Sequence, residues 1–262
     1  MALDIDRYHT VESVINRWDP RYKLAALGII VLAIAIVKTI PMALAGFILA
    51  SVLIGMTAIP FHFVSHGLSF ILIFLIPFFL IMPFTYPGEP AFTVLGLGFA
   101  WEGLRLATLI FFKALSIVLV SYAIFGSSRF DVSMLALQRL RCPKVIVQML
   151  LFTYRYTFVF LDEMRRMHTS MRSRGFIPQT NTQTMTIFGH FIGTLLIRSF
   201  ERTERVYKAM LSKGYQGELH SMVRFNSCSS DYGKSAIAIA LALLLVAGDL
   251  SGLFHQAVQG WY

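Results

Sequence analysis

Apolar residues form long runs along this chain, and short polar or proline-containing segments separate the runs. An α-helix needs about 20 mostly apolar residues to cross the hydrocarbon core of a bilayer, within a range of about 17–25. Five runs reach or approach that length. They cover residues 22–37, 42–59, 63–84, 104–125 and 236–258. The pattern predicts an all-α integral membrane protein with about five transmembrane helices.

The polar segments between these runs differ in charge. Arg17, Arg21 and Lys23 lie at the start of the first run, whereas residues 86–103 contain no Lys or Arg. Cytoplasmic loops of membrane proteins are enriched in Lys and Arg, so the N-terminus is expected in the cytoplasm and residues 86–103 outside. Five crossings then place the C-terminus, which has no basic residue after Lys234, outside as well.

The composition is that of a membrane protein, and the charged residues are unevenly distributed along the chain. The chain of 262 residues is 56% hydrophobic and 14% charged, and its mean hydropathy of +0.66 lies outside the balance of soluble domains. Residues 126–235 hold 16 Lys and Arg against 7 Asp and Glu, whereas the rest of the chain holds seven of each. The net charge of +9 therefore lies in one internal stretch, which the positive-inside bias places in the cytoplasm.

These patterns divide the chain into three parts. Residues 1–125 are predicted to form an N-terminal arm and four transmembrane helices, residues 126–235 a helical cytoplasmic module, and residues 236–262 a last transmembrane helix. The first 23 residues include acidic side chains and no short apolar core before a small-residue cleavage site. A removable signal peptide is therefore not expected.

Two further apolar runs, residues 145–161 and 185–197, lie within the basic module. Arg155 interrupts the first, and the second is shorter than a membrane-spanning helix. Basic residues flank both runs. The pattern favours helices that lie in the cytoplasmic interface with an apolar face buried and basic side chains extended to water. A hairpin that spans the membrane, which would give seven crossings, is the alternative.

A hexapeptide occurs twice in this module, as MRSRGF at residues 171–176 and as MLSKGY at residues 210–215. The similarity continues upstream at a constant offset of 39 residues. Among the aligned charges are Asp162 with Glu201 and Arg166 with Arg205. The repeat indicates one supersecondary unit that is present twice.

Each copy has the features of a helix C-terminus. Basic side chains in the last turn complement the helix dipole, and Gly175 and Gly214 occupy the position that commonly adopts the left-handed conformation. Ordinary solvated helix ends would explain a single copy. Two copies on one membrane face favour docking to a partner with two equivalent grooves, such as a pseudo-two-fold dimer of ATP-binding subunits.

The chain resembles the T components of energy-coupling-factor transporters, which are ABC-type importers, and within them the CbiQ, or cobalt-uptake, branch. The resemblance rests on LLFTYRYTFVFLDEMRRMHTSMRSRGF at residues 150–176 and RSFERTERVYKAMLSKGYQGE at residues 198–218, and it covers the layout of the whole chain. The family's boxes read Ala-Arg-Gly. The corresponding residues here, called the first and second basic-glycine boxes, are Ser173-Arg174-Gly175 and Ser212-Lys213-Gly214.

The resemblance implies a non-catalytic scaffold and energy-coupling subunit of an importer for cobalt or nickel, connected with cobalamin biosynthesis. The two boxes would dock into grooves of a pair of CbiO-like ABC subunits, which bind the ATP, so no cofactor is expected in this chain. Because Lys213 cannot form the planar, bidentate contact of an arginine, the second box is expected to bind more weakly. The residues expected to support the coupling helices are Asp162, Arg166, Glu201 and Arg205.

The same resemblance implies the chain's surroundings. The transmembrane helices would hold a CbiM-like substrate-binding S component, with or without CbiN, and would face membrane lipid. The location would be the bacterial inner membrane, with the N-terminus and the coupling module in the cytoplasm. A nucleic-acid partner is not expected, because the basic stretch adjoins the membrane and the positive-inside bias accounts for it.

Two charged residues, Lys113 and Asp249, lie near the middle of the fourth and fifth runs. A charge within a bilayer is costly unless it is paired, so the two are expected to form a structural pair across a helix interface. The alternative is a self-contained secondary transporter that uses them as an ion relay. Such transporters are commonly built from inverted repeats, whereas the repeat found here lies in the cytoplasmic stretch.

The sequence offers little for metal binding or catalysis in this chain. His62 and His66 are spaced as helical neighbours, but no carboxylate is adjacent, and the two cysteines lack metal-ligand spacing. Cobalt or nickel would require converging imidazole, carboxylate or thiolate ligands, and an enzyme would require such groups at one depth. Neither a metal site nor an active site is therefore expected.

Overall fold

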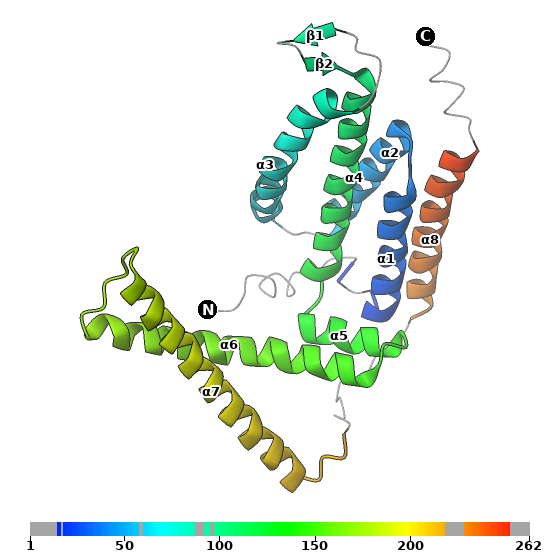
Figure 1. The fold of residues 1–262 in the computed structure, drawn as a ribbon. Helices are drawn as coiled ribbons and strands as arrows, with labels where there is room; N and C mark the ends of the chain where they lie inside the picture. The colour runs from blue at the N-terminus through cyan, green and yellow to red at the C-terminus, as the bar shows by residue number, and fades with distance from the viewer. Residues whose placement is uncertain are drawn as a thin grey trace. The chain divides into compact units, whose positions relative to one another are not determined.

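The computed structural model describes residues 15–16, 18–57, 60–86, 92–94, 97–217 and 228–251. The expected all-α class is confirmed, because helices account for most of these residues and one short antiparallel strand pair is the exception (Figure 1). The helices are α1 (Pro20–Ile36), α2 (Ile40–Met56), α3 (Phe61–Thr85), α4 (Trp101–Gly126), α5 (Phe130–Arg139), α6 (Lys144–Ser173), α7 (Thr182–Ser212) and α8 (Ser229–Leu250). The strands are β1 (Phe92–Val94) and β2 (Leu97–Phe99).

A helix lies at each of the five expected spans. Among the described residues, four helices are long and apolar enough to cross a membrane. Three of them, α3, α4 and α8, were expected to span, whereas α6 contains the run that was expected to lie in the interface. The helices α1 and α2, which were also expected to span, have 17 residues each. The last helix begins at Ser229, several residues before the predicted start at residue 236. The prediction placed the start too late because the first turns of this helix are polar and do not belong to the apolar run. The structure is that of an all-α integral membrane protein.

The two helices that contain the apolar runs of the basic module are much longer than the sequence predicts. Residues 145–161 are part of α6, a continuous helix of 30 residues, and residues 185–197 are part of α7, which has 31. Arg155 does not interrupt the first run, since a single exposed arginine is compatible with a continuing helix. Each apolar run and the charged segment that follows it therefore belong to one helix.

The chain divides into two compact units, Met1–Leu140 with Phe225–Tyr262, and Arg141–Arg224. The first unit contains α1 to α5 and α8, and the second contains α6 and α7. The second unit lies within residues 126–235, the predicted module, whereas α5 and the start of α8 pack with the first unit.

The core of the first unit is centred on α1. Leu27, Ile30 and Ile34 of this helix are completely or almost completely buried, and α1 packs against α4, α5 and α8. Small residues allow helices to approach closely in membrane proteins, and Gly103 is one example at the start of α4. A Cβ atom at this position would lie 2.5 Å from the Met82 carbonyl oxygen of α3. Close packing therefore depends on small side chains at the helix contacts.

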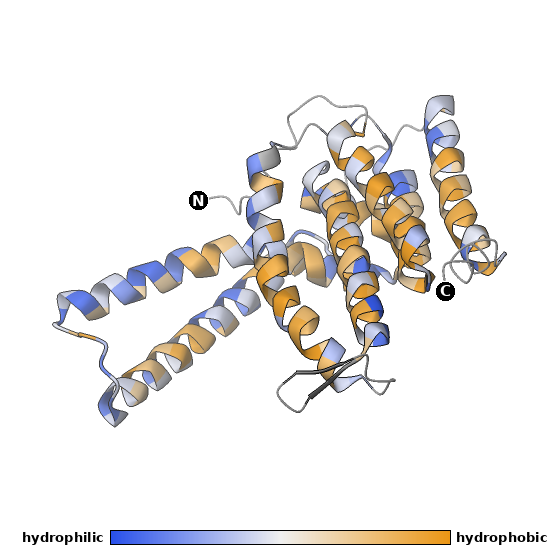
Figure 2. Ribbon diagram, turned by 90° about the horizontal axis from the view of Figure 1, so that it is seen from above, coloured by the Kyte–Doolittle hydropathy of each residue, from blue (hydrophilic) through white to orange (hydrophobic). Residues whose placement is uncertain are grey.

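The outer faces of the first unit are strongly apolar. Figure 2 shows apolar residues along most of the length of its helices. On α3, Phe70, Phe74 and Leu80 are each about two thirds exposed. Soluble monomers rarely expose apolar patches of this extent, but lipid chains solvate such a surface without cost. The exposed faces of α3 are those expected of a helix in contact with lipid.

Within the second unit, a short connection joins α6 to α7. Asn181 is the N-cap of α7, and its side-chain oxygen accepts a hydrogen bond of 2.8 Å from the Thr184 amide. The Thr184 hydroxyl in turn accepts a bond of 3.2 Å from the Gln179 amide. The first contact satisfies an amide group that the first turn of a helix leaves without a partner, and the second ties the preceding loop to that turn. They fix the point at which the chain starts α7.

Candidate functional site

The first basic-glycine box closes the C-terminus of α6. Gly175 has a φ of +80°, so the predicted left-handed conformation is confirmed. The Phe176 amide donates a hydrogen bond of 3.1 Å to the Met171 carbonyl, and the Gly175 amide donates one of 3.0 Å to the Arg172 carbonyl. This pair of bonds is the Schellman motif, which satisfies the last carbonyls of a helix. The helix therefore ends at a defined residue instead of fraying.

The second box closes α7 in the same way. Gly214 has a φ of +83°. The Tyr215 amide donates to the Met210 carbonyl at 3.0 Å, and the Gly214 amide donates to the Leu211 carbonyl at 3.0 Å. Each bond corresponds to one in the first box at the offset of 39 residues. The sequence repeat is therefore a repeat of backbone geometry.

The serine of each box is bonded within its own helix. The Ser173 hydroxyl donates to the Thr169 carbonyl at 3.1 Å, and the Ser212 hydroxyl donates to the Lys208 carbonyl at 3.0 Å. Because the hydroxyl proton is used internally, each serine presents little more to its surroundings than an alanine would. This explains in physical terms how serine can stand where the family pattern has alanine.

The cation of each box is exposed. Arg174 and Lys213 are the C-cap residues of α6 and α7 and follow the last helical residue directly. In the described part of the chain, neither side chain forms a hydrogen bond or an ion pair. The residues beside them, Phe176 and Tyr215, are half-buried. Each box therefore presents an exposed positive charge, without a side-chain partner among the described residues, at a defined helix end.

The two boxes differ in what holds the residue after the glycine. The Phe176 ring packs edge-on against the Phe188 ring of α7, with 5.8 Å between centroids. The Tyr215 hydroxyl instead donates to the Gln148 side-chain oxygen of α6 at 3.1 Å, and the Gln148 amide donates to the Gly217 carbonyl at 3.1 Å. Sequence reasoning missed Gln148, because no spacing pattern connects it with residues almost 70 positions later.

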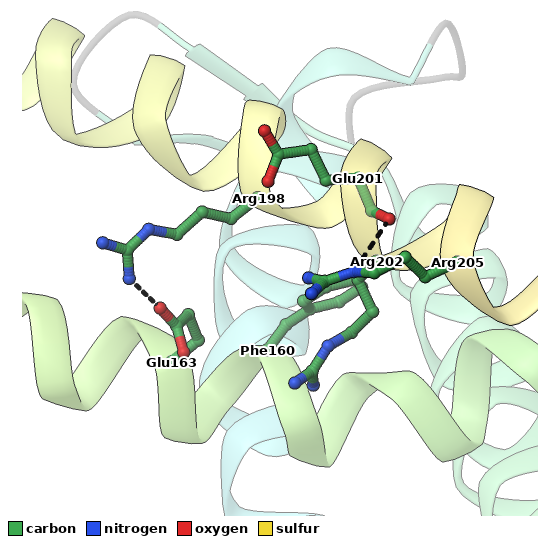
Figure 3. A pocket seen from close by; sticks show the side chains of 6 residues that line it. All are labelled: Phe160, Glu163, Arg198, Glu201, Arg202 and Arg205. Atoms are coloured by element: carbon green, nitrogen blue, oxygen red, sulfur yellow. Dashed lines mark hydrogen bonds and ion pairs between the residues drawn. The ribbon is translucent and has the colours of Figure 1, made fainter.

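A polar pocket lies between α6 and α7 (Figure 3). Its volume is about 270 Å³. Arg198 and Arg202 extend from α7 toward α6, and Arg198 forms an ion pair with Glu163. The Arg205 Nε donates to the Glu201 backbone carbonyl of its own helix at 3.3 Å. The residues that line the pocket are Phe160, Glu163, Arg198, Glu201, Arg202 and Arg205.

Of the four residues expected to support the coupling helices, two line this pocket and two do not. Glu201 and Arg205 line the pocket, whereas Asp162 is exposed and forms an ion pair of 3.5 Å with Arg165. Arg166 is exposed, and its side chain forms no bond within the described ranges. An ion pair between the helices is instead made by Glu163 and Arg198. The sequence does not predict this pair, because the two residues are not related by the offset of 39 residues.

Asp249, near the end of α8, binds the turn between α1 and α2. Its carboxylate accepts hydrogen bonds from the Lys38 amide at 3.1 Å, the Thr39 amide at 3.0 Å and the Thr39 hydroxyl at 2.7 Å. Thr39 is the N-cap of α2, where free amide groups and the helix dipole favour a negative charge. The carboxylate therefore compensates the N-terminus of α2.

Lys113 of α4 binds the other side of the same turn. Its Nζ donates to the Ala35 carbonyl in the last turn of α1, at 2.9 Å. A positive charge is favourable there because the last carbonyls of a helix carry partial negative charge. In the described part of the chain, Lys113 bonds to a backbone carbonyl, Asp249 bonds to two backbone amides and the Thr39 hydroxyl, and the two charges do not bond to each other. These contacts give each charge a structural partner, and their direct pairing stays a prediction.

The two contacts predict that removing either charge lowers the stability of the turn between α1 and α2. We expect Asp249→Ala to lower the free energy of unfolding by about 1–3 kcal/mol, because it removes the acceptor of the Lys38 and Thr39 amides and of the Thr39 hydroxyl. With Lys113→Met added, the loss should be greater than for Asp249→Ala alone, because Lys113 holds the other side of the same turn. Unfolding in mixed micelles measures these values, with Asp249→Asn, which retains an acceptor, as the control. A double variant more stable than Asp249→Ala alone would show instead that the charges form a direct pair.

No cluster of three or more His, Cys, Asp or Glu side chains that could hold a metal ion occurs within the residues that the structure describes. His66 stacks edge-on against Phe70, with 5.6 Å between ring centroids. Cys142 and Cys228 are free thiols. The candidate functional site consists of the charged groups at the two helix ends, which repeat one backbone geometry, and those between α6 and α7.

The sequence of this chain is similar to those of several known proteins. The family model described as CbiQ, cobalt transport protein, matches residues 11–224, which include both boxes. An uncharacterized protein of Methanocaldococcus jannaschii is 25% identical over 250 residues, which cover 93% of this chain and 86% of that protein. The energy-coupling factor transporter transmembrane protein EcfT of Heliobacterium modesticaldum is 22% identical over 82% of this chain and 85% of its own length. The cobalt transport protein CbiQ of Rhodobacter capsulatus is 27% identical over 44% of each chain.

Proposed function

Because this chain belongs to the CbiQ family of cobalt transport proteins, we propose that it is the energy-coupling subunit of an energy-coupling-factor importer for cobalt or nickel. In this role it is a transmembrane scaffold without catalytic activity. A pair of ATP-binding ABC subunits, similar to CbiO, hydrolyses ATP. A separate membrane subunit, similar to CbiM and with or without CbiN, binds the transported ion.

The observation that carries this proposal is the duplicated helix end. Two long helices of one unit end in the same Schellman motif, and each end presents an exposed cation, Arg174 or Lys213, with no partner among the described residues. A charge-assisted hydrogen bond to a carboxylate in a protein groove is among the stronger polar contacts. Two such ends suit a dimer of ATP-binding subunits, which offers one groove in each subunit.

The geometry suggests how ATP hydrolysis drives transport. ATP binding brings the two ATP-binding subunits together and hydrolysis releases them, so the two docked helix ends are moved relative to each other. Because α6 and α7 are stiff helices that contact each other at Glu163 and Arg198, displacement of their ends changes the angle at which they cross. The substrate-binding subunit, held by the transmembrane helices, would change orientation in response.

The charge distribution supports the orientation of this assembly. Residues 126–235 contain 16 of the 23 Lys and Arg residues, and the positive-inside bias places such a stretch in the cytoplasm, where ATP is available. The apolar outer faces of α3, with Phe70 and Leu80 largely exposed, would contact lipid or the membrane subunit. We therefore assign the protein to the bacterial inner membrane, with its N-terminus and both boxes in the cytoplasm.

The proposal is tested by purifying the chain alone and together with the proposed ATP-binding and substrate-binding subunits. We expect the chain alone to hydrolyse no ATP, and the chain expressed with an ATP-binding ABC subunit to co-purify with it as an active ATPase. Uptake of radioactive Co²⁺ or Ni²⁺ by proteoliposomes should require ATP and the substrate-binding subunit. Uptake by the chain alone, driven by an ion gradient, would show instead that it is a secondary transporter.

A further inference from the structure

The first turn of α1 contacts both ends of the chain segment that contains the second unit. On one side, Ser127 and Ser128 connect α4 to α5, and α5 ends at Arg139, just before the second unit begins at Arg141. On the other side, α8 begins at Ser229, shortly after the second unit ends at Arg224. The chain therefore joins the second unit covalently to the first unit at these two connections.

Lys23 of α1 holds the first connection. Its side chain is 1% exposed, and the residue lies among the buried groups of the first unit. The Nζ donates to the Ser127 carbonyl at 3.3 Å, to the Ser127 hydroxyl at 2.9 Å and to the Ser128 hydroxyl. The three donors of the ammonium group thus have three acceptors, all at the C-terminus of α4.

Tyr22, the residue before Lys23, contacts the start of α8 at the second connection. The Tyr22 hydroxyl donates to the Tyr232 hydroxyl in the first turn of α8 at 2.8 Å, and the two rings are 4.8 Å apart between centroids. Asp19 fixes the turn itself, because its carboxylate accepts from the Arg21 amide at 3.0 Å and forms an ion pair of 2.8 Å with the Arg21 guanidinium. Tyr22 and Lys23, which are adjacent in the first turn of α1, therefore contact both connections.

The buried lysine is a costly way to join two helices. Burial of an ammonium group is unfavourable unless it is paired, and no carboxylate is among the hydrogen-bond partners of Lys23. The partial negative charge at the C-terminus of α4 compensates it only in part. An apolar side chain would fill a helix contact without this cost. The advantage of lysine here is directional: three hydrogen bonds fix the position of Ser127 and Ser128 relative to α1.

We propose that Lys23 is a positioning residue for energy coupling, which holds the start of α5 on α1 so that displacement of the second unit moves the membrane helices. This inference rests on the proposed function. The lysine touches neither the ATP-binding subunits nor the ion. Its loss should therefore leave ATP hydrolysis in place and separate it from transport.

The test uses the assembled transporter in proteoliposomes with radioactive Co²⁺ and ATP. Lys23→Met is expected to retain the bound ATP-binding subunits and their ATP hydrolysis, and to lower Co²⁺ uptake per ATP hydrolysed by about tenfold. In the purified chain, the same change should lower the hydrogen-exchange protection of residues 130–139 by about tenfold. Lys38→Met is the matched control, because the exposed Lys38 side chain lies at the other end of α1 and forms no bond among the described residues.

Ser128→Ala gives a milder form of the test, because it removes one acceptor and leaves the lysine. Combined with Lys23→Met it should cause no further loss, since the two changes remove one interaction. Unchanged exchange in residues 130–139, or unchanged uptake per ATP in Lys23→Met, would overturn the inference. Absence of ATP-driven uptake with the wild-type chain would instead overturn the proposed function, and with it this inference.

Discussion

Replacement of Arg174 and Lys213 together by glutamate is expected to abolish metal uptake and to release the ATP-binding subunits from the purified complex. Both side chains are exposed at helix ends and have no partner in the described residues, so the folded structure of this chain should not depend on them. A groove that accepts a cation is expected to be acidic. The reversed charges would repel it at both docking points.

The single changes should have unequal effects. A charge-assisted hydrogen bond contributes about 1.5–3 kcal/mol, which corresponds to a loss of about 10- to 150-fold in affinity. Arg174→Ala should fall in this range, whereas Lys213→Ala should cost less, because lysine lacks the planar, bidentate contact. Lys213→Arg should strengthen the binding of the ATP-binding subunits. Surface plasmon resonance with the chain in nanodiscs measures these affinities.

A matched control uses two exposed basic residues away from the boxes. Arg139 and Arg155 are exposed, and their side chains form no bonds within the described ranges. Arg139→Glu with Arg155→Glu makes the same change in net charge and should leave co-purification and uptake close to those of the wild type. If both double variants lose the ATP-binding subunits equally, the total charge of the cytoplasmic segment, and not the two boxes, determines docking.

Substitution of the two box glycines is expected to have the second largest effect. Gly175 and Gly214 have φ angles of +80° and +83°, a conformation that costs a residue with a Cβ atom about 1–2 kcal/mol. No atom lies within 4 Å of an added Cβ at either position, so the cost is conformational and not steric. Gly175→Ala with Gly214→Ala should favour continuation of the helices past their ends and lower uptake by at least about tenfold.

Asparagine at the same positions provides the control. It adopts the left-handed conformation more readily than alanine, so Gly175→Asn with Gly214→Asn should retain most of the uptake that the alanine variant loses. Uptake of radioactive Co²⁺ by cells, with the amount of membrane-inserted protein measured in parallel, gives the comparison. Equal uptake by the alanine variant and the wild type would mean that the defined helix ends are not needed.

Much of this structure could be predicted from the sequence, and the reason differs between its parts. The positions of α1, α2, α3, α4 and α8 follow from the apolar runs, and α3, α4 and α8 reach the length that a bilayer imposes on a helix that crosses it. The length of α6 was not predicted, because its apolar run continues into a charged segment of the same helix. The ends of α6 and α7 follow from Gly175 and Gly214, because glycine adopts the left-handed conformation most readily. Local chemistry determines both features.

The contacts between distant segments could not be predicted in this way. The ion pair of Glu163 with Arg198 and the contact of Gln148 with Tyr215 depend on how α6 and α7 lie together, which no residue spacing encodes. Lys113 and Asp249 were expected to contact each other because each is costly alone in a bilayer. The free backbone groups at the turn between α1 and α2 offered partners that the sequence pattern does not reveal.

The central claim is that the two boxes dock to two ATP-binding subunits. It is tested most directly by placing the photoreactive residue p-benzoylphenylalanine at position 173, at position 212, or at both, in the assembled transporter. We predict that each single variant cross-links to one ATP-binding subunit on illumination, and that the double variant yields a product with two such subunits on one chain. Cross-links to the substrate-binding subunit alone, or no product with two ATP-binding subunits, would contradict the claim.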